Sequence, residues 1–484
     1  MNSGNSDNSF RSILKGTSIF GSVQVFNIVV AAVRLKFVAL ILGPAGMGVA
    51  GLFNSISLTI QQFASLGLNL AVVKEVGAAK EDSDRLKSIV SAALPVAMML
   101  ALAGSLVCLV FPGLLSGMTF GNQHYRTAFM ILSASVFFSI VGAALMSVLQ
   151  GLREVRRLSG ASVVGSLVGL IVGVPMYWFW GTGGIVPAMV ALSAATCGWY
   201  LISLKKSLTF HPEAWNRDIH LPIARKILGM GLILMSNELF KSVAAYLINV
   251  YVRSAGGEVE VGFYQSCSTM TSQYSAIVFT AMTMEYLPRL ASAAKDNSGM
   301  CDVVNRQLEV VGYMVAPMVC AVILLAPLVI ELLQTSEFIV AAPLLRLLAL
   351  AVAVRAVMYP LGYIVFAKDN RRLFFWMESV GANLLTLLLT CGCYSLFGLN
   401  GLGIAAIADC GICVAVYLIV NRILYGYRLS RKAVLTSSGL MASSSAMAVI
   451  SFLLEGPVMY LSGAMLLLLT IFFAAANLKR LWSR

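Results

Sequence analysis

Length and composition exclude a water-soluble globular protein. The chain has 484 residues, of which 59% are hydrophobic and only 11% charged, and its mean hydropathy is +0.87. A soluble domain carries about 25% charged residues. The formal net charge of +13 is interpreted as a membrane-topology signal rather than as nucleic-acid binding.

Apolar runs of about 20 residues, the length that crosses the hydrocarbon as a helix, recur along the chain. We therefore predict an all-α polytopic membrane protein with about 14 transmembrane helices. The polar start, MNSGNSDNSF, has no cleavable signal pattern, so the first span is expected to be retained. The predicted spans are residues 16–42, 44–70, 88–115, 126–150, 159–180, 184–204, 227–252, 262–287, 310–334, 339–366, 373–396, 401–424, 435–454 and 458–478.

The basic residues lie mainly on one side of these spans. Of the 34 Lys and Arg, two (Arg126 and Arg253) fall in external segments and five lie within spans, so the other 27 fall in segments expected on the cytoplasmic side. Since Lys and Arg accumulate in cytoplasmic loops, both termini are predicted to be cytoplasmic.

Short motifs repeat at a nearly constant offset. The basic loops QGLREVRRLSG (150–160) and FAKDNRRLFFW (366–376) share an Arg-Arg-Leu sequence 215 positions apart. Gly48 and Gly262 open spans 214 positions apart, and GTGGIVPA and GLNGLGIAA open spans about 217 apart. The shared offset predicts two pseudo-symmetric six-helix lobes, related by an axis along the membrane normal.

The predicted domain organisation follows from this repeat. It comprises a cytoplasmic tail, an N-terminal lobe, a cytoplasmic inter-lobe linker, a C-terminal lobe, and a final loop with two additional helices. These parts are residues 1–15, 16–204, 205–226, 227–424 and 425–484.

Pseudo-symmetric lobes that enclose a path and move by alternating access are transporter architecture. No segment between spans exceeds the roughly 22 residues of 205–226, which leaves no room for a soluble catalytic domain. A GxxxxGK[ST] phosphate loop is absent from the sequence. An ATP-driven pump in a single chain is therefore excluded, and the chain is expected to be a transporter rather than an enzyme.

One predicted span, ILMSNELFKSVAAYLINVYV (233–252), carries Asn237, Glu238 and Lys241 near its middle. A charge at the centre of a membrane helix costs about 2.5 to 3.5 kcal/mol, so such residues usually face a bundle interior or a wet cavity. Glu238 and Lys241 are three apart and can neutralise each other as a structural pair. The positions 214 residues earlier are Gln24 and Asn27, so both lobes present polar groups at one depth.

The charges deep within spans are predominantly basic. Glu285 and Glu378 are expected near cytoplasmic ends, within reach of water. A cation-rich cavity favours anionic cargo, because guanidinium and ammonium groups bind phosphates and carboxylates. The deep basic residues are Arg34, Lys36, Lys241, Arg346 and Arg355, against the acidic residues Glu238, Glu331 and Asp409.

These basic residues need not all face one cavity. Lys36 has the alternative of reaching the external headgroups by snorkelling. Arg346 and Arg355 are nine positions apart, which places them on opposite faces of an ideal helix, so one of them is left for packing unless nearby prolines distort the helix.

Other conspicuous residues have structural explanations. Cys391, Cys393, Cys410 and Cys413 lie in apolar helices without nearby histidine, so no metal or cofactor is expected. Gly165, Gly169 and Gly173 form a GxxxGxxxG stripe that favours close helix packing.

Several segments together resemble a known family. They are LILGPAGMGVAGLFNSI, SVLQGLREVRRLSGASVVGSLVG, VEVGFYQSCSTM, EYLPRLA and YIVFAKDNRRLFFWMESVG. The chain resembles, over residues 12–424, the Wzx-type polysaccharide flippases of the multidrug/oligosaccharidyl-lipid/polysaccharide (MOP) exporter superfamily. It is especially similar to their O-antigen and enterobacterial-common-antigen branch. The fourteen predicted spans depart from the twelve of that branch and look more like the lipid II flippase arrangement.

The resemblance implies an inner-membrane protein that moves an undecaprenyl-diphosphate-linked oligosaccharide to the periplasmic leaflet, where polymerisation or chain-length machinery would act on it. We expect Arg34, Lys241 and Arg355 to contact the diphosphate or acidic sugars, and Glu238 or Asp409 to couple transport to protonation. Expected hydrogen-bonding residues of the cavity are Gln24, Asn27, Asn237 and Asn249.

Two alternatives stay open from the sequence. A MATE-like exporter of small molecules or drugs shares the architecture, although cationic cargo calls for a net acidic cavity. A membrane-embedded polysaccharide polymerase or glycosyltransferase would handle the same lipid, but such enzymes need long external loops, and the external segments here have about ten residues or fewer.

Overall fold

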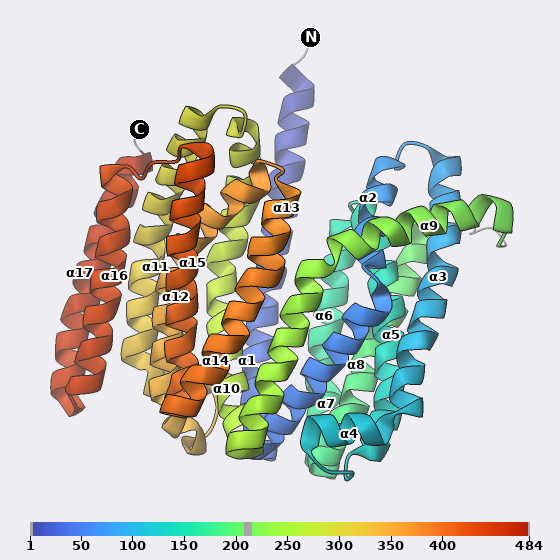
Figure 1. Cartoon of the computed structure of the whole chain (residues 1–484), viewed down its shortest axis with the longest axis horizontal. Coiled ribbons are helices and arrows are strands. Elements are labelled where there is room, and N and C mark those ends of the chain that lie inside the picture. The colour runs from blue at the N-terminus through green and yellow to red at the C-terminus, as the bar shows by residue number, and fades with distance from the viewer. Residues whose placement is uncertain (1–2, 208–214, 483–484) are drawn as a thin grey trace. The chain divides into compact units, whose positions relative to one another are not determined.

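The computed structural model describes the backbone of residues 3–207 and 215–482. It describes the side chains of residues 26–207 and 215–480, apart from 233, 234, 277, 281 and 284. Within these residues every regular element is a helix, of α, 3₁₀ or π type, as predicted (Figure 1).

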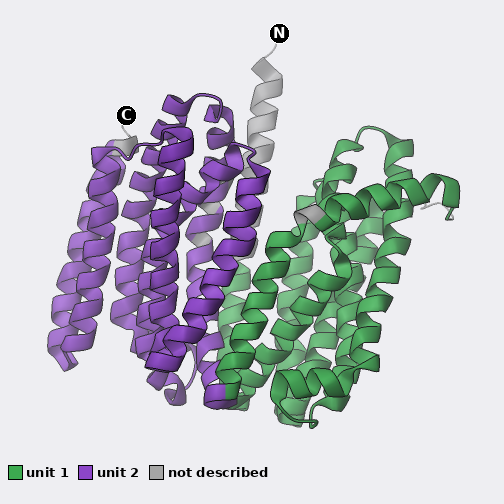
Figure 2. Ribbon diagram, in the orientation of Figure 1, with its two compact units in different colours: residues 1–254 green, residues 255–484 purple. Residues whose placement is uncertain are grey.

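The chain divides into two compact units, residues 1–254 (unit 1) and 255–484 (unit 2), coloured separately in Figure 2. Unit 1 contains α1(Ser3–Ser65), α2(Leu68–Ala78), α3(Ser83–Val110), α4(Pro112–Phe120), α5(Arg126–Gly151), α6(Val155–Ile171), α7(Gly173–Trp180), η1(Gly181–Gly184), α8(Ile185–Ser207), α9(Arg217–Leu234) and the first part of α10(Ser236–Ala293). Unit 2 contains the rest of α10, then α11(Asn297–Leu333), η2(Ser336–Ala341), α12(Ala342–Ala367), α13(Arg371–Phe374), η3(Phe375–Ala382), α14(Asn383–Phe397), α15(Leu399–Tyr425), α16(Arg431–Leu453) and α17(Gly456–Trp482).

The division between the units falls within α10, downstream of the predicted linker, residues 205–226. That linker ends inside α9, and α9 packs against α2 and α3 of unit 1. Residues 208–214 of the predicted linker lie outside the described part of the chain.

The fourteen predicted spans fall on helices, interrupted at short breaks such as Leu66–Gly67 and Val172. Ten helical stretches in the described residues are long and apolar enough to cross a membrane, or up to eleven if α9 and α10, bent by 55°, form one broken span. Two of the ten, residues 26–65 and 155–207, contain breaks and so accommodate two predicted spans each. The protein is an all-α polytopic membrane protein.

The backbone repeats its turns at the offset predicted from the sequence. Helices α5 and α12 also begin and end 216 positions apart. A positive φ angle is unfavourable for most residues. Finding such angles at equivalent positions of the two halves therefore supports a structural repeat. Three pairs of residues with positive φ lie 214, 216 and 217 positions apart: Gly43 and Gly257, Arg153 and Asp369, and Gly181 and Gly398.

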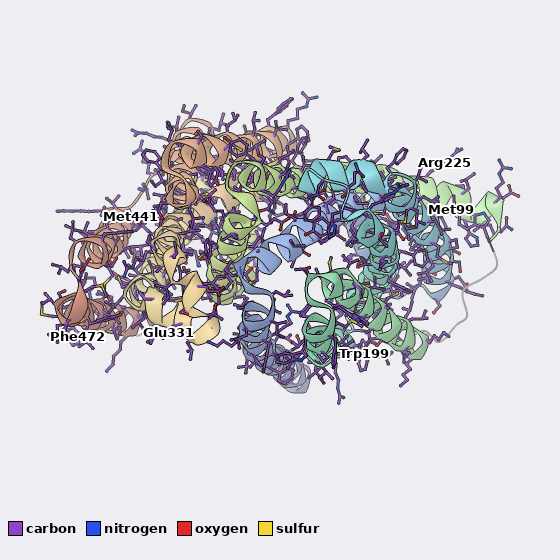
Figure 3. The ribbon with its side chains drawn as sticks, turned by 90° about the horizontal axis from the view of Figure 1, so that it is seen from below. Met99, Trp199, Arg225, Glu331, Met441 and Phe472 are labelled. Carbon is purple, nitrogen blue, oxygen red and sulfur yellow. The ribbon has the colours of Figure 1, made fainter. Side chains whose placement is uncertain are left out.

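Each unit has its own apolar core. In unit 1 the core joins α2, α3, α5, α8 and α9, and in unit 2 it joins the second part of α10 with α11, α12, α15 and α16. Large apolar side chains also cover the outside, such as Met99 on α3 (69% exposed) and Phe472 on α17 (76% exposed), which point outward in Figure 3. Such outward apolar surface is suited to contact with lipid.

Candidate functional site

Unit 1 contains a polar pocket of about 480 Å³ formed by α1, α5, α6 and α8. Arg34 is the charged residue in its lining, and Asn54 and Gln61 contribute carboxamides. None of the lining side chains is acidic. The hydroxyl groups in the lining belong to Ser57, Ser135, Ser139, Ser162, Ser166, Ser193, Thr196 and Tyr200.

Small residues on α6 make room for the guanidinium of Arg34. A Cβ atom added at Gly169 would lie 2.5 Å from Nη1 of Arg34, so any larger residue at this position would displace the guanidinium from its place here. A Cβ atom at Gly165 would lie 3.1 Å from Cγ2 of Thr196 on α8. The glycine stripe therefore has a packing role, as expected, and it also admits the arginine.

Asn27 joins the same pocket through a side-chain hydrogen bond. The hydroxyl of Ser166, a lining residue, donates to Oδ1 of Asn27 at 2.7 Å. Of the residues proposed from the sequence, the structure thus brings Arg34 and Asn27 together in unit 1. The side chain of Gln24, on the same helix, lies outside the described side chains.

Internal hydrogen bonds hold several of the pocket hydroxyls. Ser135 donates to the Met189 carbonyl at 3.3 Å, and Thr196 donates to the Leu192 carbonyl at 2.9 Å. A hydroxyl has one proton and two lone pairs, so each of these groups keeps acceptor capacity for a ligand.

Unit 2 contains a cluster of polar and charged side chains on α12, α14 and α15. The Thr386 hydroxyl donates to Oδ2 of Asp409 at 3.0 Å. Arg355 interacts electrostatically with Asp409 and through a hydrogen bond with the neighbouring Cys410. Oδ1 of Asp409 is buried and has no hydrogen-bond partner among the described residues. The structure therefore brings Arg355 and Asp409 close enough to interact electrostatically.

Glu378 adds a second carboxylate to this part of unit 2. It lies in the π-helical segment η3, whose wider turn is a feature often found at functional sites. It accepts a hydrogen bond from the hydroxyl of Tyr417 on α15. Glu378 is partly buried against α15, whereas Glu285 is exposed and pairs with Arg289 at 2.7 Å.

Arg346 has packing contacts instead of a cavity position. Its side chain is 9% exposed; Nη1 donates to the Ser451 carbonyl at 2.6 Å and Nη2 lies 3.7 Å from Sδ of Met459. The guanidinium also lies over the ring of Phe452, 5.7 Å from its centre. Arg346 thus holds α12 against α16 and α17. This is the packing role that the sequence left open for one of the two arginines on opposite faces of the helix.

The remaining proposed residues are not among those that line the unit 1 pocket. Lys241 and Glu238 form the expected ion pair at 3.9 Å, with side chains 69% and 51% exposed. Lys36 and Asn237 are partly buried, and Asn249 is buried on α10.

Sequence reasoning missed the hydroxyl lining of the unit 1 pocket. Serine and threonine are common in membrane helices, and single residues of this type carry no distinctive signal. Aligning the two halves at an offset of 216 would have singled out Ser139 and Ser162, because their counterparts in unit 2 are Arg355 and Glu378.

Comparisons with known proteins agree with this fold. The family model described as "Polysaccharide biosynthesis protein" matches residues 37–343. The Lipid III flippases of Escherichia coli (strain K12) and Shigella flexneri are each 22% identical over 352 residues, covering 71% of this chain and 82% of each relative.

Solved structures show the same architecture. An inward closed conformation of the lipid II flippase MurJ superposes with a TM-score of 0.72 at 14% identity, covering 96% of this chain and 99% of that one. An inward-facing MATE multidrug resistance transporter of the MOP superfamily gives a TM-score of 0.67 at 17% identity, covering 84% and 98%. These relatives are flippases and transporters rather than enzymes, and they confirm the resemblance drawn from the sequence. With a family model matching more than half of its length, the chain belongs to the polysaccharide biosynthesis protein family.

Proposed function

We propose that this chain is a flippase for an undecaprenyl-diphosphate-linked oligosaccharide, an O-antigen or related surface-polysaccharide repeat unit. It would carry the cargo from the cytoplasmic to the periplasmic leaflet of the bacterial inner membrane by alternating access. Membership of the polysaccharide biosynthesis family and likeness to two lipid-linked precursor flippases support this proposal.

The observation that carries the proposal is the chemistry of the unit 1 pocket. A hydrated glycan and its diphosphate cross hydrocarbon only if polar groups replace water, and this pocket offers hydroxyls, carboxamides and one arginine inside a membrane-spanning lobe. The pocket has no acidic lining residue, so its charge favours an anionic cargo.

The proposed contacts to the diphosphate or to acidic sugars come from Arg34, Lys241 and Arg355, with Lys36 as a further cation near Arg34 in sequence. Arg346 is left out because its contacts bind α12 to α16 and α17. Hydrogen bonds to the sugars would come from Gln24, Asn27, Asn237 and Asn249.

Glu238 and Asp409 are the proposed coupling residues. Asp409 has a buried carboxylate oxygen without a hydrogen-bond partner among the described residues, which suits a group that gains and loses a proton. Glu238 is half exposed beside Lys241. We expect a proton gradient to drive transport through one of these carboxylates, and polymerase or chain-length proteins to receive the glycan afterwards.

Reconstitution tests the function. Purified protein in liposomes, with a labelled undecaprenyl-diphosphate oligosaccharide, is followed by the accessibility of the label to an impermeant reagent, with and without an imposed pH gradient. We expect protein-dependent loss of protection that responds to the gradient.

The binding residues are tested in the same assay. Lys241→Ala and Arg355→Ala should each slow flipping about tenfold, equivalent to about 1.4 kcal/mol. The control Arg126→Ala changes an exposed arginine at the start of α5 and should flip normally. Full transport by both variants at normal expression would refute the role of these cations.

The fold likeness to a MATE multidrug transporter favours a second candidate, a small-molecule exporter. Folded protein that flips no lipid-linked glycan but lowers drug accumulation in cells would establish that alternative. A cationic drug, however, would meet Arg34 and no carboxylate in the unit 1 pocket.

A further inference from the structure

Equivalent positions of the two units carry different chemistry. The offset of 216 that relates α5 to α12 aligns Ser139 with Arg355, and the same offset aligns Ser162 with Glu378. The offset of 217 between Gly181 and Gly398 aligns Leu192 with Asp409. Small or neutral residues thus line the unit 1 pocket at positions where unit 2 carries an arginine and two carboxylates.

In unit 2 the arginine has a carboxylate of the same unit nearby. Asp409 interacts electrostatically with Arg355, and Glu378 accepts a hydrogen bond from Tyr417. A cation inside a protein is expensive unless an anion accompanies it. Asp409 supplies such an anion near Arg355.

Unit 1 contains an arginine without such a carboxylate. Arg34 enters its pocket from α1, opposite α6, where Gly169 leaves space for it. Position 162, which in unit 2 is glutamate, is serine, and none of the ion pairs found among the described residues involves Arg34. Among the described residues the pocket therefore offers Arg34 no carboxylate, and an anionic ligand would supply one.

The hydroxyl groups that line the unit 1 pocket indicate which other groups the ligand must carry. The protons of Ser135, Ser166 and Thr196 are donated to other protein atoms, so these oxygens face a ligand mainly as acceptors. Such acceptors require a ligand rich in O–H or N–H donors, whereas Arg34, which has only donors, requires an acceptor with negative charge. A planar carboxylate matches the guanidinium fork in a bidentate pair, and its single charge matches the single cation.

We propose that the unit 1 pocket binds a hexuronate, a pyranose that bears one carboxylate, with the carboxylate on Arg34 and the sugar hydroxyls on the serine and threonine oxygens. The pocket of about 480 Å³ lies in the range of sites for small organic ligands. The identification of this sugar as a residue of the transported glycan rests on the proposed function.

The binding test uses the full-length protein in lipid nanodiscs and saturation-transfer-difference NMR, which detects weak ligands. The probes are glucuronate, galacturonate, glucose, glucose 6-phosphate and acetate. We expect at least one hexuronate to bind, with glucose, acetate and glucose 6-phosphate at least tenfold weaker. If glucose 6-phosphate binds as tightly as both hexuronates or more tightly, the pocket is a phosphate site and the proposal is overturned. If glucose binds as tightly as the hexuronates, the carboxylate does not contribute to binding and the role given to Arg34 is refuted.

Two variants test the residues. Arg34→Gln should weaken hexuronate binding at least tenfold. Ser162→Glu places in unit 1 the carboxylate that unit 2 has at Glu378, and should weaken binding similarly while leaving the protein folded, because the new carboxylate neutralises Arg34. Arg126→Gln is the matched control and should bind normally. Unchanged binding in a folded Ser162→Glu protein would refute the assigned pocket.

Flipping measurements separate this inference from the proposed function. Lipid-linked glycans with and without a hexuronate residue are compared in liposomes, and Arg34→Gln should abolish the preference for the acidic glycan. Flipping of both glycans with equal efficiency, unaffected by Arg34→Gln, would refute the inference while the flippase function stands. Hexuronate binding without any flipping would refute the function while the ligand class of the pocket stands.

Discussion

Three arginines of the membrane-spanning helices have three different surroundings. Arg34 faces hydroxyls in a pocket, Arg355 has Asp409 nearby, and Arg346 donates to a backbone carbonyl of a neighbouring helix. An ionisable residue inside a membrane helix is a functional candidate by default, and more so when it lines a polar pocket without an acidic side chain, as Arg34 does. By this criterion Arg34 is the strongest of the three as a ligand-binding residue.

Arg346→Ala should lower stability and leave transport by folded protein intact. The substitution removes the hydrogen bond to the Ser451 carbonyl and leaves a space beside Phe452, so we expect a loss of about 2 kcal/mol or more. The thermal midpoint in detergent, measured beside the exposed control Arg126→Ala, checks this expectation. Loss of flipping with an unchanged midpoint would instead assign Arg346 to substrate binding.

The residue types of the site were predictable from sequence, but their surroundings were not. Arg34, Asn27 and Asp409 were recognisable because polar groups in apolar runs are rare. The partners of each arginine depend on contacts between residues far apart in the sequence, such as Arg346 with the Ser451 carbonyl. Glu378 lies in a π-helical segment, which no sequence period reveals.

At the scale of elements, α9 is held firmly to unit 1. Its Gly231 lies so close to the break after α1 that a Cβ atom there would be 2.6 Å from the Leu66 carbonyl oxygen. Lys226 on the same helix forms an ion pair at 2.8 Å with Glu75, a carboxylate of α2 whose residue is only 8% exposed. The helix that precedes α10 is therefore packed as part of unit 1 rather than as a free linker.

Gly231→Ala should displace α9 and destabilise the protein, because the added methyl group collides with backbone atoms that have no rotamer to change. Gly229→Ala is the matched control on the same helix, since nothing lies within 4 Å of its added Cβ. Monodispersity and thermal midpoint measure both variants. Equal tolerance of the two alanines would contradict the close crossing.

Helix positions were predictable from apolar runs, whereas some breaks within them were not. Predicted spans end near Gly43 and Gly257, and at each of these glycines the backbone is non-helical and two helices meet at a kink. The fifth predicted span is broken at Val172 into α6 and α7. Hydropathy detects length and polarity, but a break confined to one or two residues leaves the average unchanged.

At the scale of the whole molecule, the distribution of basic residues predicts both termini in the cytoplasm. A fluorescent protein that folds only in the cytoplasm should fluoresce at the C-terminus, and a phosphatase active only outside should be active after residue 123, in the turn between α4 and α5. The reverse pattern would invert the assigned topology and the direction of transport.

The repeat was the most informative signal in the sequence, because three weak motifs shared one offset. The structure places positive-φ turns at the same offsets, which motif comparison alone did not locate. The chemistry at equivalent positions has diverged while these turns have not, since a turn is constrained by backbone geometry and a lining residue only by its ligand.

The paired turns have a consequence for engineering. Because positive φ recurs at Arg153 and Asp369, and likewise at Gly181 and Gly398, these positions are natural junctions at which the helical segment between them can be exchanged from one lobe to the other. A chimera with the unit 1 segment in both lobes would carry serine in place of Glu378 and would leave Asp409 as the remaining carboxylate near Arg355, so the two carboxylates of unit 2 can be varied one at a time.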